Sequence, residues 1–93
     1  MKTVPGFRLR KLGNEYILVG ESMELINFNK MITLNETAAF LWEQAEQLSA
    51  KDGFTASDLC KALCNEYEVS PEQALTDVDA TIKSWLDAGV ITA

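Results

Sequence analysis

The hydrophobic period of the chain changes once, near Asn35, and this change restricts the possible folds more than any other feature. Before it, apolar and basic residues alternate in residues 7–11, and residues 16–19 are rich in β-forming side chains. The Gly-Asn pair within residues 12–15 is typical of a tight hairpin turn. Alternation returns over residues 28–34, after an ambiguous segment. The first third of the chain therefore predicts three strands.

After Asn35, apolar residues recur with the period of a helix, and polar residues mark three helix starts. Asn35 is a suitable cap for the first helix, which should end near residue 49. Thr55, followed by Asp58, resembles a capping box for a second helix that runs to about residue 66. Ser70 precedes a proline and then a glutamine, which predicts a third helix that ends at Gly89.

Three strands followed by three helices predict an α+β fold with a three-stranded antiparallel sheet and a winged helix-turn-helix outline. We expect a single domain over residues 1–93, because this length lies below the commonest domain size of about 100–150 residues. The apolar side of the last helix is predicted to contain Leu75, Val78, Ile82, Trp85 and Leu86.

The chain contains no histidine and two cysteines, which leaves few groups for catalysis or metal binding. Cys60 and Cys64 match the first two ligands of a C-x3-C-x2-C iron–sulfur motif, but Tyr67 occupies the third position. Both cysteines lie on the apolar side of the second predicted helix, so we interpret them as buried structural thiols. We therefore expect no catalytic residue, no metal and no cofactor.

The net charge of −6 and the pI of about 4.5 argue against nucleic acid as the partner. The helix-turn-helix outline still leaves a DNA-binding winged-helix regulator as the alternative function. Its recognition helix would present acidic residues, among them Glu72, Asp77 and Asp79, where DNA readers present basic or amide side chains. No apolar segment approaches the length of a membrane span, so we expect a cytoplasmic protein with no membrane partner.

Five segments resemble the PqqD family in content and in order. They are residues 7–10 (FRLR), 16–19 (YILV), 34–42 (LNETAAFLW), 69–72 (VSPE) and 86–91 (LDAGVI). The resemblance extends over nearly the whole chain, and the LNETA run before a Trp-bearing helix is its most specific part. The family is named for a protein of pyrroloquinoline quinone (PQQ) biosynthesis.

The resemblance implies a non-catalytic peptide chaperone, which binds the leader segment of a ribosomally made precursor peptide and presents it to a modifying enzyme. That enzyme is often a radical S-adenosylmethionine (SAM) protein. In such domains the leader adds as a strand beside the third strand and lies against the third helix. Applied to this chain, with the margin of the apolar helix face as the groove, the implied peptide-binding residues are Asn29, Lys30, Met31, Ile32, Thr33, Ala74, Asp77, Val78, Thr81 and Trp85. Val78 and Trp85 also suit a purely structural role in the core, and Asp77 and Thr81 also suit plain solvent exposure.

Overall fold

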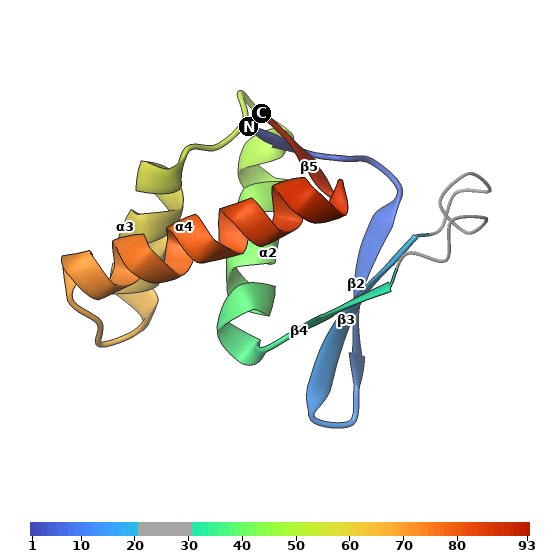
Figure 1. Ribbon diagram of the computed structural model, residues 1–93, viewed down its shortest axis with the longest axis horizontal. Helices are drawn as coiled ribbons and strands as arrows, with labels where there is room; N and C mark the ends of the chain where they lie inside the picture. Colours follow the sequence, from blue (N-terminus) through green and yellow to red (C-terminus); the bar gives the residue numbers. More distant parts are fainter. Residues whose placement is uncertain (21–30) are drawn as a thin grey trace.

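A three-stranded antiparallel sheet forms the first part of the fold in the computed structural model, which describes residues 1–20 and 31–93. β2 (Phe7–Leu12) pairs with β3 (Glu15–Gly20), and β3 also pairs with β4 (Met31–Leu34). β3 is therefore the central strand (Figure 1). The third strand was predicted over residues 28–34, of which residues 28–30 lie outside the described part and the rest form β4.

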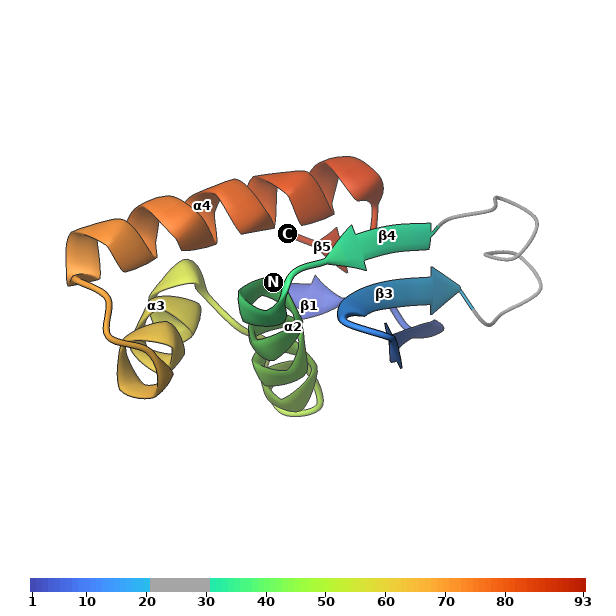
Figure 2. The ribbon, with the colours of Figure 1, turned by 90° about the horizontal axis from the view of Figure 1, so that it is seen from below.

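Three helices follow the sheet: α2 (Glu36–Ser49), α3 (Ala56–Glu66) and α4 (Pro71–Ala88). The predicted fold class, an α+β fold with this sheet followed by three helices, is confirmed. Figure 2 shows α4 passing α3 and α2, with its C-terminal half beside the edge strand β4. No helix in residues 1–20 or 31–93 combines the length and the apolar character that are needed to cross a membrane.

The helix ends follow the capping residues that the sequence predicts. Asn35 and Ser70 each accept a hydrogen bond from the backbone N–H three residues later, at 2.7 and 3.1 Å. Thr55 and Asp58 form a reciprocal capping box, with distances of 3.1 and 3.0 Å. Gly89 ends α4 in the left-handed region, with a φ of 77°. These local interactions satisfy backbone groups that a helix leaves without partners at its ends.

A second, two-stranded sheet joins the two ends of the described chain and was not predicted. β1 (Lys2–Thr3) pairs antiparallel with β5 (Ile91–Thr92), so both termini lie together (Figure 1). The backbone carbonyl of Met1 also accepts a hydrogen bond from the N–H of Phe54 at 2.7 Å. Strands of two residues are too short to show alternation, and their partner is distant in the sequence, so no local pattern indicates them.

The buried side chains form one apolar core between the sheet and the helices. At its centre, Trp42 of α2 meets Trp85 of α4 edge to face, with ring centroids 5.3 Å apart. The predicted apolar side of α4 needs a correction, because Leu75 and Leu86 are exposed and Ala74 is fully buried. The N-terminal half of α4 packs against α3, and the residue buried there is Ala74 in place of Leu75.

Two glycines with positive φ provide a matched test of this packing. Gly53 has a φ of 99°, and a Cβ atom there would lie 2.7 Å from the carbonyl oxygen of Met1. Gly13, in the hairpin turn, has a φ of 62° and open space around the position of a Cβ. We expect Gly13→Ala to lower the free energy of unfolding by about 1 kcal/mol through backbone strain alone. Gly53→Ala should lower it by a further ~1–3 kcal/mol, since the methyl group displaces the first residue.

Urea unfolding, followed by the fluorescence of the two buried tryptophans, measures both losses. Equal losses in the two variants would contradict the close approach of Gly53 to Met1.

Candidate functional site

The outer edge of β4 is the first element of the candidate site. In the part of the chain that the structure describes, β4 pairs with β3 and with no other strand. Along an antiparallel edge strand, alternate residues direct their N–H and C=O groups away from the sheet. The outer edge of β4 therefore offers backbone donors and acceptors to an added strand.

A hollow of about 250 Å³ separates β4 from the C-terminal half of α4, which runs alongside it (Figure 2). Its walls come from β4, the start of α2 and α4: Ile32, Thr33, Leu34, Asn35, Ala38, Ala80, Thr81, Ser84 and Trp85. Trp85 is only 1% exposed, so its ring is part of the core as well as of the wall. This first hollow is lined by apolar and small polar side chains.

A second hollow of about 320 Å³ adjoins the first along α4. It is lined by Asn35, Thr37, Ala38, Leu41, Asp77, Ala80 and Thr81. Four of these residues also line the first hollow, so the two share a wall. We call the two hollows together the β4–α4 groove.

Asp77 carries the charge of this groove. It is the one charged side chain among the described residues that line either hollow. The side-chain amide of Gln73, one turn earlier on α4, donates a hydrogen bond to Asp77 Oδ1 at 2.9 Å. This bond orients the carboxylate, which is half-buried. The groove therefore presents a positioned negative charge at one end.

The structure brings together half of the predicted peptide-binding residues. Ile32, Thr33, Thr81 and Trp85 line the first hollow, and Asp77 lines the second together with Thr81. The backbone of the predicted residue Met31 belongs to β4. The predicted residues Asn29 and Lys30 lie outside the described part of the chain.

Two of the predicted groove residues lie in the core instead. Ala74 and Val78 have no exposed surface, so their side chains offer nothing to a peptide in this structure. The prediction assumed that Leu75 belongs to the buried face of α4, which would place Ala74 at the margin of that face. In the structure the buried face contains Ala74 and Val78, and Leu75 is exposed.

Sequence reasoning missed the contribution of the start of α2. Asn35, Thr37 and Ala38 reach the groove because α2 begins directly after β4, and no local pattern shows which way that turn faces. Ala80 and Ser84 were also missed, although a signal existed for them. They lie three residues after Asp77 and Thr81, respectively, and residues three apart share a helix face.

The cysteines are less buried than predicted. Cys60 and Cys64 are free and partly exposed, and they line another hollow beside Pro71. Burial raises the pKa of the Cys60 thiol, and the nearby carboxylate of Asp79 and the thiol of Cys64 raise it further. Cys60 is therefore a protonated thiol at neutral pH. Among residues 1–20 and 31–93, no cluster of three or more His, Cys, Asp or Glu side chains is arranged to hold a metal ion.

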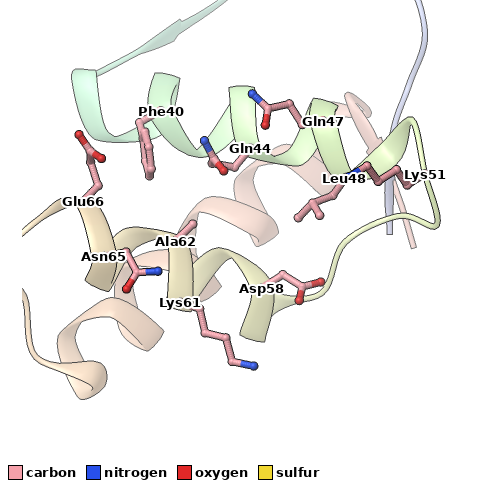
Figure 3. A pocket seen from close by; sticks show the side chains of 10 residues that line it. All are labelled: Phe40, Gln44, Gln47, Leu48, Lys51, Asp58, Lys61, Ala62, Asn65 and Glu66. Atoms are coloured by element: carbon pink, nitrogen blue, oxygen red, sulfur yellow. The ribbon is translucent and has the colours of Figure 1, made fainter.

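A further hollow lies between α2 and α3 and is shown in Figure 3. Phe40 and Leu48 point from α2 toward α3, whereas Lys61 points away from α2. The carboxylate of Asp58 is already engaged in the capping box of α3. The other residues that line this hollow are mostly amide, lysine and glutamate side chains. None of these lining residues is a buried polar group. We therefore take the β4–α4 groove as the candidate site.

Comparison with solved structures supports the fold. The described chain aligns with a protein described as "TbiB1 in Complex with the TbiA(beta) Leader Peptide", with a TM-score of 0.69 and 14% identity over 97% of this chain and 93% of that one. It also aligns with "Lasso peptide synthetase B1 complexed with the leader peptide", with a TM-score of 0.68 and 23% identity over 99% and 96% of the two chains. At these identities the similarity establishes a shared fold. No curated protein sequence is significantly similar to the chain.

Comparison with family models identifies the family. The model described as coenzyme PQQ synthesis protein D (PqqD) matches residues 15–91. The match includes β3, β4, all three helices and both hollows of the groove. It agrees with the resemblance seen in the sequence, and the chain belongs to the PqqD family.

Proposed function

We propose that this chain is a non-catalytic domain that binds the leader segment of a ribosomally synthesised precursor peptide. The leader adds as a strand to the outer edge of β4, and its side chains enter the β4–α4 groove. The observation that carries the proposal is the position of the β4 edge, which pairs with no other strand in residues 1–20 and 31–93, directly beside a hollow with a wall on α4. The edge supplies backbone partners, and the hollow supplies contacts with side chains.

Hydrogen bonds between the backbone of the leader and the edge of β4 provide part of the affinity. An extended peptide beside β4 gains main-chain hydrogen bonds whatever its sequence, which provides affinity without much selectivity. Every second side chain of such a peptide faces the same side. The side chains that face α4 meet Ile32, Thr81 and Trp85, and these contacts provide selectivity.

The comparisons support this proposal. The two similar structures are described as complexes with leader peptides, and the family model is named for a PQQ synthesis protein. We propose that the chain works in the cytoplasm and that a separate modifying enzyme, such as a radical SAM protein, receives the bound precursor. In this proposal the chain contributes binding and presentation, and the partner contributes the chemistry.

DNA binding is the less favourable interpretation of the same helices. The N-terminal half of α4 would serve as the recognition helix, and it carries Glu72, Asp77 and Asp79. Carboxylates at these positions repel a phosphate backbone, and the net charge of −6 adds to the repulsion. The strand edge also has no role in that function.

A proline in β4 tests the strand-addition mechanism. Met31→Pro removes one backbone N–H, and if that donor faces the leader, affinity should fall about tenfold for every leader alike. The fold should persist, because an edge strand tolerates proline where the N–H does not pair within the sheet. The measurement is titration of a cognate leader, to be identified from the neighbouring genes, with circular dichroism to verify folding.

Met31→Ala is the matched control, since it changes the side chain and keeps the N–H. It should bind the leader within about twofold of wild type, a difference of a few tenths of a kcal/mol. A folded Met31→Pro variant with unchanged affinity would place the site elsewhere.

The dependence of binding on salt separates the peptide from the nucleic-acid interpretation. Backbone pairing and apolar contacts should lose less than about tenfold in affinity between about 50 mM and about 200 mM salt, whereas a protein with many phosphate contacts loses about 10³-fold or more. Fluorescence titration of the same leader at the two salt concentrations measures the change. A steep loss would count against strand addition as the main source of affinity.

A further inference from the structure

We propose that the leader recognised by this chain carries a basic residue two positions from an apolar residue, with the basic residue paired to Asp77. This inference rests on the proposed function and deepens it, because it names the chemistry of the peptide that the groove accepts. The apolar residue fills the first hollow, beside Trp85. The basic residue enters the second hollow, beside the start of α2.

The spacing follows from the arrangement of the two hollows. They share the wall formed by Asn35, Ala38, Ala80 and Thr81, so their centres are neighbours along α4. The direction from the first hollow to the second is also the direction in which β4 continues into α2. A strand beside β4 directs alternate side chains to one side at intervals of about 7 Å. Two successive inward side chains therefore reach the two hollows.

The chemistry of the first hollow favours an apolar side chain. Trp85 is buried, Ile32 is half-buried, and Ala38 and Ala80 add methyl groups to the walls. The polar residues here are Thr33, Asn35, Thr81 and Ser84, and none of them carries a charge. A charged side chain would lose its hydration here without gaining a partner of opposite charge.

The chemistry of the second hollow favours a cation. Asp77 is half-buried, and its Oδ1 already accepts the hydrogen bond from Gln73. Because Gln73 is neutral, this bond positions the carboxylate without neutralising its charge. A lysine or arginine from the leader would neutralise it through a charge-assisted hydrogen bond.

The N-terminus of α2 also borders the second hollow and would favour an anion there, but the side chains of Asn35 and Glu36 reduce this effect. Helix N-termini attract anions through their free N–H groups. Here Asn35 Oδ1 accepts the N–H of Ala38 at 2.7 Å, and Glu36 adds a negative charge in the first turn of α2. The Asp77 carboxylate therefore dominates the electrostatics of the second hollow.

Selection from a phage-displayed library of random peptides tests the inference even when the sequence of the leader is unknown. Wild type, Asp77→Asn, Asp77→Lys and Asp79→Lys are each used as bait. Asp77→Asn keeps an oxygen that Gln73 can donate to and removes the charge. Asp79→Lys makes the same change of charge as Asp77→Lys at an exposed position of α4 outside the groove.

Wild type and Asp79→Lys should select peptides with lysine or arginine two positions from a recurrent apolar residue. Asp77→Lys should select aspartate or glutamate at that position instead. A synthetic wild-type-selected peptide should bind Asp77→Asn about tenfold more weakly, as expected for the loss of a charge-assisted hydrogen bond.

Two failures have different meanings. In the first, all four baits select apolar peptides without a basic residue, and Met31→Pro no longer binds these peptides. That result would overturn the role of Asp77 and leave the proposed function in place. A wild-type protein that selects no peptide at all, although circular dichroism shows it folded, would overturn both.

Discussion

The edge-to-face contact between Trp42 and Trp85 is the interaction on which the rest of the structure depends. It joins the middle of α2 to the C-terminal half of α4, with both rings withdrawn from solvent. α2 also contacts β3 and β4, so the same pair sets the position of α4 relative to the sheet. Because protein interiors are packed nearly as densely as organic crystals, a change at either ring would alter the width of the β4–α4 groove. Trp85 is therefore part of both the core and the wall of the candidate site.

The candidate site combines a wall on α4 with the outer edge of β4. α4 is an 18-residue helix, capped at both ends and packed on α3, so its groove residues are held in place. β4 has four residues in the described structure, and a short edge strand limits uncontrolled pairing with other chains. A peptide that also fills the groove gains contacts that an arbitrary strand lacks. This combination favours selective strand addition over aggregation.

Local sequence signals predicted the helices well and the buried faces less well. The caps at Asn35, Thr55 and Ser70 were identified because each involves residues within one turn. The sequence did not predict that Ala74 is buried in place of Leu75, because α4 packs against α3 and also contacts α2 through Trp42 and Trp85. The cysteines of α3 were expected to be buried and are only partly covered. Burial depends on which neighbour a helix meets, and a periodic pattern contains no information about the neighbour.

The sequence alone determined the fold class, the helix boundaries and the family, because caps, turns and hydrophobic periods are interactions between residues a few positions apart. It also placed the candidate site at the third strand and the third helix, through the family resemblance. Only the tertiary structure decided that the start of α2 closes the groove and that Asp77 is its one charged group among the described residues. The same is true of the pairing of β1 with β5. These features unite segments distant in the chain, and their geometry is set by the packing of the shared core.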